Sequence, residues 1–110
     1  MTPTFNWQHQ VPSDHACFPH HFAGDALVPG ALLLHWINTH LAEHVKMRIS
    51  AIKQIKFLHP VRPAELIEVA FYALEKNHQF RLEVIFAQTQ TDILKGQVQL
   101  SSIDIEVDLP

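Results

Sequence analysis

The 110-residue chain has little of what would send it to a membrane or out of the cell. Its only cysteine, Cys17, has no second thiol in the chain with which to form a disulfide. The polar residues 1–10 lack the basic region followed by an apolar stretch that marks a secretory signal. No apolar run approaches the roughly 20 residues that a membrane-spanning helix needs, because the best one is interrupted by His35. These absences predict a soluble cytoplasmic protein that does not bind a membrane.

Charge is also scarce. Charged side chains make up 17% of the residues and the net charge is −3, which argues against nucleic acid as a partner. Hydrophobic residues make up 47%, a large share for a chain that has room for one core only. We therefore expect residues 1–110 to form a single domain that covers part of its apolar surface with another subunit, as a homo-oligomer.

The positive charges are concentrated in one window that contains no Asp or Glu. Its basic residues are Lys46, Arg48, Lys53, Lys56 and Arg62. A solvated strand face accounts for such a cluster, and so does a docking surface for an acidic partner protein. The sequence leaves both interpretations open.

The pattern of apolar residues predicts one helix and several strands. Pro29 suits the first position of a helix, and apolar residues at three- and four-residue spacing extend it to about Val45. Its first turns are apolar almost all round, so we expect the N-terminal half to be buried and the C-terminal half to reach the surface. Strands are expected in residues 5–11 and in a segment that ends near Phe57. A strand that starts near Leu66 and alternates over 67–73 is followed by a loop at 76–79 and a strand at 80–86. Further strands are expected around Val98 and Leu100 and in 103–108.

One helix followed by an antiparallel meander is an α+β pattern in which the sheet wraps the helix. Pro60 and Pro63 cannot donate to a sheet ladder, so they mark a corner between two strands.

The segment from His21 to His35 offers chemistry. It places His21 on a turn-rich loop, where an imidazole that titrates near pH 6.5 can act as a general base. The free backbone amides at the helix start, with Gly30 allowing close approach, can polarise a carbonyl. Inside the apolar helix, His35 must find a partner or cost roughly 1 to 3 kcal/mol. A plainer interpretation of His21 is a loop histidine that is hydrogen-bonded to the backbone. A plainer interpretation of the segment at Gly30 is an ordinary helix start.

The same segment resembles the signature of the β-hydroxyacyl-acyl carrier protein dehydratases of the FabA/FabZ type. In that family a His-Phe-x-Gly loop leads through Pro-Gly into the central helix of a hotdog fold, and the helix bears a catalytic acid fourteen positions after the loop histidine. Here that position holds His35. Residues 56–66 resemble the family's strand, Pro-x-x-Pro turn and next strand. The triplet Leu34-His35-Trp36 is closest to the ApeI-like dehydratases of aryl polyene and related lipid pathways.

The resemblance implies dehydration of a 3-hydroxyacyl-acyl carrier protein thioester to the trans-2-enoyl thioester, in fatty acid, polyketide or aryl polyene biosynthesis. It implies no cofactor and no metal. His21 would be the base. For His35 three roles stay open: it is the acid, it orients the hydroxyl or a water, or it is a satisfied core histidine. Gly30 would hold the thioester oxygen. The acyl tunnel would be lined by Phe22, Val28 and Phe57, for each of which a core position is the plainer interpretation.

The resemblance also implies partners. The two catalytic residues would come from different subunits of a homodimer or larger homo-oligomer, alone or with other subunits of the pathway. Acyl carrier proteins are acidic as a class, so the basic window would be their docking surface.

Other functions and sites stay open. A thioesterase uses the same fold but needs a carboxylate, and Asp25 is the only acid near the helix start. A non-catalytic acyl-binding or scaffold subunit is favoured if His35 is buried against its own core. His40 and His44 have the one-turn spacing of a metal pair, although solvated histidines are the better interpretation of both.

Overall fold

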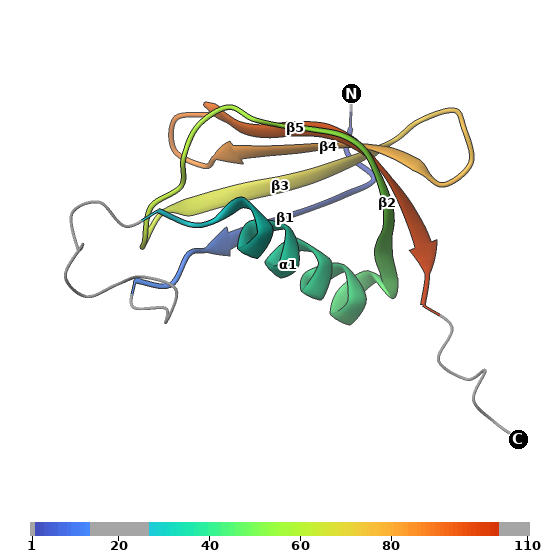
Figure 1. The fold of residues 1–110 in the computed structure, drawn as a ribbon, viewed down its shortest axis with the longest axis horizontal. Helices are drawn as coiled ribbons and strands as arrows, with labels where there is room; N and C mark the ends of the chain where they lie inside the picture. Colours follow the sequence, from blue (N-terminus) through green and yellow to red (C-terminus); the bar gives the residue numbers. More distant parts are fainter. Residues whose placement is uncertain (1, 14–26, 104–110) are drawn as a thin grey trace, which may run out of the picture.

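The computed structural model describes residues 2–13 and 27–103, and Figure 1 shows their arrangement. An antiparallel sheet curves over one face of a helix, which confirms the α+β class. The elements in chain order are β1 (Phe5–Gln10), α1 (Gly30–His40), the π-helical turn η2 (Leu41–Val45), β2 (Met47–Phe57), β3 (Leu66–Ala73), β4 (Gln79–Phe86) and β5 (Asp92–Ser102). The strand order is β1-β3-β4-β5-β2, and every neighbouring pair is antiparallel.

The helix ends where the sequence predicts and begins one residue later. Pro29 is extended, with φ −60° and ψ 142°, so it caps α1 and the first helical residue is Gly30. The helical backbone continues through η2 to Val45, as expected, and stops at Lys46, which adopts the left-handed conformation with φ 62°. Within the described residues, no helix combines the length and the apolar character that a bilayer crossing needs.

The prediction that the N-terminal half of the helix is the buried half is wrong. Burial follows one face along the whole length: Leu33, Ile37 and Leu41 are fully buried, whereas His35 and Thr39 are exposed. The reason is that the sheet covers only one side of the helix (Figure 1). The buried stripe packs on the inward side chains of the sheet, which include Ile67, Val69, Phe71, Leu82, Val84, Val98 and Leu100.

The strand predictions are confirmed with small differences at the ends. Strand β1 ends at Gln10, because Val11 turns inward and exchanges backbone hydrogen bonds with Ala64 and Glu65 instead of continuing the ladder. Gln79 already belongs to β4, so the β3–β4 turn covers residues 74–78. The strand expected in residues 103–108 lies outside the described residues beyond Ile103, which is not in a strand.

The corner predicted at Pro60 and Pro63 is confirmed, since residues 58–65 connect the end of β2 with the start of β3. This corner lies beside the start of α1, because the Val28 amide donates to the Val61 carbonyl at 2.8 Å. The fold therefore brings the helix start, the end of β2 and the start of β5 together at one end of the sheet.

Candidate functional site

An apolar pocket opens where α1 begins. Its volume is about 370 Å³, and its lining residues come from the helix start, the corner after β2 and the start of β5: Val28, Gly30, Leu33, Phe57, Leu58, His59, Pro60, Val61 and Ile93. Three residues singled out by the sequence, Gly30, Val28 and Phe57, therefore share one pocket. The fourth lining candidate, Phe22, lies outside the described residues.

The start of α1 lies at this pocket, with Gly30 among the lining residues. Leu32 and Leu33 both donate to the Pro29 carbonyl, at 3.0 and 3.1 Å, which closes the first turn. No carbonyl in residues 2–13 or 27–103 accepts a hydrogen bond from Gly30 or Ala31. Unbonded amides at a helix N-terminus attract anionic oxygen, so this end can hold the charge that builds on a thioester carbonyl.

Phe57 closes over the helix start. A Cβ atom built on Gly30 would lie 2.7 Å from the Phe57 Cζ atom, closer than real Cβ contacts allow. The glycine is thus required here for the close approach of the ring. Phe57 itself remains 52% exposed and its neighbour Leu58 46% exposed, so the apolar wall of the pocket is open to a ligand or to another subunit.

Among the described residues that line the pocket, His59 is the one with a polar side chain. Its Nδ1 atom lies 2.8 Å from the Asp92 carbonyl oxygen, which can only accept. Sequence reasoning treated His59 only as part of a motif. A signal was present, since it follows the predicted tunnel residue Phe57 by two positions at a strand end.

His35 is exposed on α1. The interpretation as a satisfied core histidine of its own chain is therefore wrong, and solvent removes the cost that burial would impose on the ring. His35 does not line the pocket that holds Gly30 of the same chain. The proposed base His21, like Asp25, lies outside the described residues, so its role stays a prediction.

The basic window forms an exposed strip. All five of its cations are exposed, with Arg48, Lys53 and Lys56 on β2, which is an edge strand of the sheet. Both ion pairs found in the described part of the chain, Arg81 with Glu83 and Lys95 with Asp92, leave this strip out. Among the described residues, the cations of this strip therefore have no ion-pair partner, and three of them lie along an edge strand.

A histidine–tryptophan cluster joins β1 to the helix, and the sequence did not predict it. The His40 ring stacks on Trp7 with centroids 3.9 Å apart and lies 4.3 Å from His44, while His9 lies 5.1 Å from Trp36. His44 is exposed, but His40 is half-buried, so the expectation of two solvated histidines is wrong for His40. Within the described residues, no group of three or more His, Cys, Asp or Glu has the arrangement of a metal site.

Burial shifts the titration of this cluster. Burial lowers the pKa of His9, whose Nε2 atom has no hydrogen-bond partner among the described residues. Burial also lowers the pKa of His40, and the nearby His44 lowers it further. Both rings are therefore held in the neutral form more strongly than free imidazoles.

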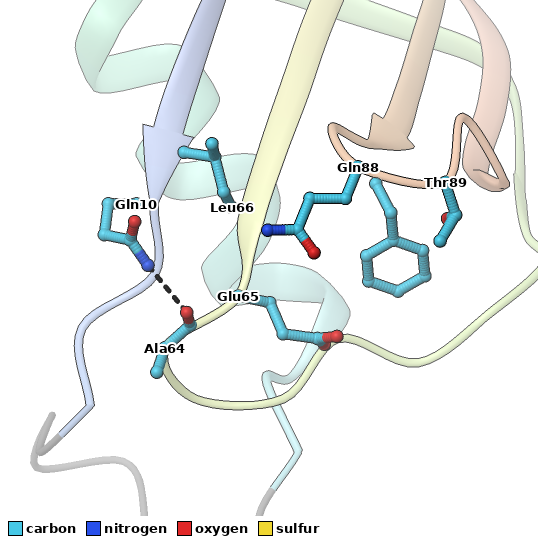
Figure 2. Close-up of a pocket in the computed structure, with 7 residues that line it drawn as sticks. Gln10, Ala64, Glu65, Leu66, Gln88 and Thr89 are labelled. Atoms are coloured by element: carbon cyan, nitrogen blue, oxygen red, sulfur yellow. Dashed lines mark hydrogen bonds between the residues drawn. The ribbon is translucent and has the colours of Figure 1, made fainter.

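A second hollow, of about 380 Å³, lies between the ends of β1, β3 and β4. Figure 2 shows Gln10 and Gln88 on opposite sides of the start of β3, and the Gln10 side-chain amide donates to the Ala64 carbonyl at 2.7 Å. Glu65, in the same hollow, accepts a hydrogen bond from the Arg62 amide at 2.7 Å. None of the described residues predicted for catalysis or substrate binding lines this hollow, whereas Val28, Gly30 and Phe57 line the pocket at the helix start.

Comparison with solved structures defines the fold. An uncharacterized protein from Erwinia carotovora subsp. atroseptica is similar with a TM-score of 0.68 and 22% identity, over 89% of this chain and 82% of that one. The dehydratase heterocomplex ApeI:P from Xenorhabdus doucetiae gives a TM-score of 0.65 and 21% identity, over 91% and 98%. A hexameric thioesterase, y2039 from Yersinia pestis, gives a TM-score of 0.66 and 12% identity, over 91% of this chain and 87% of that one. The protein has the hotdog fold, which both dehydratases and thioesterases use.

The sequence model of the ApeI-like family, described as ApeI dehydratase, matches residues 2–97. Because that match covers most of the chain, the protein belongs to the ApeI-like dehydratase family, as the resemblance of the His21–His35 segment implied. A search of curated proteins gives no match.

Proposed function

We propose that the protein removes water from a 3-hydroxyacyl thioester carried on acyl carrier protein, giving the trans-2-enoyl thioester. The observation that carries this proposal is the apolar pocket lined by Gly30, whose amide has no acceptor among the described residues, in a chain of the ApeI-like dehydratase family. The pocket suits an acyl chain, and the amide suits the oxygen of its thioester. Fatty acid, polyketide and aryl polyene biosynthesis all contain this reaction.

The reaction needs three groups. In the proposed mechanism the His21 imidazole takes the proton from C2, and the electron pair forms the C2–C3 double bond while the C3–O bond breaks. The imidazolium of His35 gives its proton to the departing hydroxyl, which leaves as water, and solvent then returns both rings to their starting states. The Gly30 amide holds the charge that builds on the thioester oxygen. Positioned acids and bases typically contribute about 10²- to 10⁴-fold each.

The exposure of His35 supports a site shared between two subunits. In the single chain His35 lies on the outer side of α1, away from the pocket that contains Gly30. We infer that it completes the pocket of a neighbouring subunit, where it meets that subunit's His21. Two imidazoles close together titrate in coupled steps, because a second positive charge is penalised, and this favours one charged and one neutral ring.

The surface of the chain has features that suit two kinds of partner, another subunit and an acyl carrier protein. Edge strand β2 exposes Ile52, at 51%, near its middle and Phe57 at its end, which suits contact with another subunit. The ApeI:P structure is a heterocomplex, so we propose that this chain assembles either with a second copy or with another hotdog subunit. The basic strip on β2 supports docking of an acidic acyl carrier protein.

A thioesterase reaction has less support. A hotdog thioesterase needs a carboxylate beside the thioester, and no Asp or Glu stands among the described residues that line the pocket. A non-catalytic scaffold was favoured only by a buried His35, which is exposed instead.

The test is incubation of the purified protein with a 3-hydroxyacyl-acyl carrier protein, followed by mass spectrometry of the carrier. A carrier-bound product lighter by one water supports dehydration. Release of the free acid would assign a thioesterase, and an unchanged substrate would assign a non-catalytic subunit.

A further inference from the structure

Of the described side chains that line the pocket at the start of α1, one can form a hydrogen bond. Among its lining residues in the described part of the chain, every side chain except that of His59 is apolar or absent. In an apolar pocket, a few placed polar groups fix the orientation of the ligand and provide specificity. Among the lining side chains that the structure describes, His59 is therefore the one that can select a ligand by a hydrogen bond.

The backbone and the ring of His59 are both held to β5. The Leu58 and His59 amides donate to the Ile93 carbonyl at 2.7 and 3.3 Å, and the His59 Nδ1 atom lies 2.8 Å from the Asp92 carbonyl oxygen. A carbonyl oxygen only accepts, so the hydrogen of the neutral ring is on Nδ1. The remaining ring nitrogen, Nε2, then carries a lone pair and accepts hydrogen bonds.

The chemistry of the proposed substrate matches this acceptor. A 3-hydroxyacyl thioester carries two oxygens close together, the carbonyl oxygen at C1 and the hydroxyl at C3. The carbonyl oxygen needs a donor, which Gly30 supplies, and the hydroxyl hydrogen needs an acceptor. A hydroxyl that donates its hydrogen to Nε2 keeps the lone pairs of its oxygen free. That oxygen can then accept a proton from the acid and leave as water.

We propose that His59 is a specificity-determining residue, whose Nε2 atom accepts a hydrogen bond from the 3-hydroxyl group of the bound acyl chain. This inference rests on the proposed function, because it concerns the substrate of the same pocket. His59 selects 3-hydroxyacyl chains over saturated chains of equal length. One neutral hydrogen bond gives a preference of about tenfold in the dissociation constant.

Two substitutions separate this role from a purely structural one. His59→Asn keeps a donor at the position of Nδ1, so it can still bond the Asp92 carbonyl, but it has no atom at the position of Nε2. His59→Gln places an amide oxygen near the position of Nε2 and gives up the Nδ1 bond. His78→Asn is the matched control, since His78 is exposed in the β3–β4 turn, at the other end of the sheet.

The experiment measures binding of two unreactive ligands by calorimetry: a 3-hydroxyacyl pantetheine amide and the saturated acyl pantetheine amide of the same length. We expect the unmodified protein and His78→Asn to bind the hydroxylated ligand about tenfold more tightly. His59→Asn should bind both ligands equally at an unchanged melting temperature, and His59→Gln should keep part of the preference.

Equal binding of both ligands by the unmodified protein, or a preference retained in His59→Asn, would overturn the inference. A preference lost in both His59 variants together with a lower melting temperature in both would also overturn it, in favour of a structural role. Turnover of the reactive thioester is measured separately, so a protein that prefers the hydroxylated ligand without dehydrating it would refute the proposed function and support the role of His59.

Discussion

The ring of Phe57, at the end of β2, lies against the first residue of α1, so that a methyl group on Gly30 would fall 2.7 Å from the Phe57 Cζ atom. This relationship ties the width of the pocket to the absence of a side chain at position 30. It also keeps the amide at the helix start within reach of a ligand that occupies the pocket.

Gly30→Ala should damage activity more than stability. Gly30 does not have a positive φ, so its backbone accepts alanine, and the half-exposed Phe57 ring can swing outward. We expect the free energy of unfolding to change by less than about 1 kcal/mol. The kcat/KM for dehydration should fall by about 10²-fold, because the methyl group and the displaced ring obstruct the oxygen that Gly30 holds.

Gly96→Ala is the control with the opposite expectation. A Cβ atom there would collide with the backbone carbonyl of Gln54 on β2, which cannot move as a side chain can. We expect a loss of about 1 to 3 kcal/mol in urea unfolding. An active Gly30→Ala protein would contradict the role of the helix start, and the double variant Gly30→Ala/Phe57→Ala should recover part of the activity.

The histidine–tryptophan cluster should make the fold sensitive to mild acid. Burial holds the pKa of His9 and His40 below the ordinary value of 6.5, so the unfolded chain binds more protons than the folded one once the pH falls below that value. Stability is therefore full above about pH 6.5 and is lost as the pH falls through the lowered pKa values. Urea unfolding between pH 8 and pH 5 measures this.

The control for the pH experiment is His9→Gln, which removes the half-buried imidazole whose buried Nε2 atom has no hydrogen-bond partner among the described residues. The variant should show a shallower loss of stability below pH 6.5 than the unmodified protein. A profile as steep as that of the unmodified protein would exclude His9 as a source of the effect.

A structural feature can be predicted from the sequence when the residues that determine it are close together in the chain. Strands β3 and β4 alternate apolar and polar residues on a sheet with one buried face, so their pattern is local and their prediction succeeded. The burial of α1 was mispredicted because it depends on which side the sheet covers, and an apolar N-terminal half does not carry that information.

The contents of the site follow the same rule. Gly30, Val28 and Phe57 were predicted as site residues because a motif carries them, and the pocket contains all three. The ring contact between His9 and Trp36 joins residues far apart in the chain, and no local pattern marks such a pair. The acceptor state of His59 depends on the Asp92 carbonyl, which only the folded sheet places beside it.

Docking of the carrier protein is tested by reversing charge on β2. The double variant Lys53→Glu/Lys56→Glu should raise KM for carrier-bound substrate far more than KM for a small thioester mimic, because only the carrier contacts the strip. The difference should shrink at high salt, which screens exposed charges. Lys76→Glu, in the β3–β4 turn, is the control and should change neither value. Equal effects on both substrates would reject docking at β2.

The two proposed catalytic histidines differ in what can replace them. His21→Ala should abolish dehydration, because no other group takes the C2 proton. His35→Glu should keep measurable activity, since a carboxylic acid can also protonate the departing hydroxyl, and its pH profile should shift toward that of a carboxylic acid. Full activity in His21→Ala would remove the assignment of the base.

The most direct measurement concerns whether His21 and His35 act from separate subunits. His21→Ala and His35→Ala carry different affinity tags, are produced together, and the mixed dimer is purified through both tags. One of its two sites then has both histidines, so we predict about half of the unmodified activity from two inactive parents. A mixed dimer as inactive as its parents would place both histidines in one subunit and contradict the account.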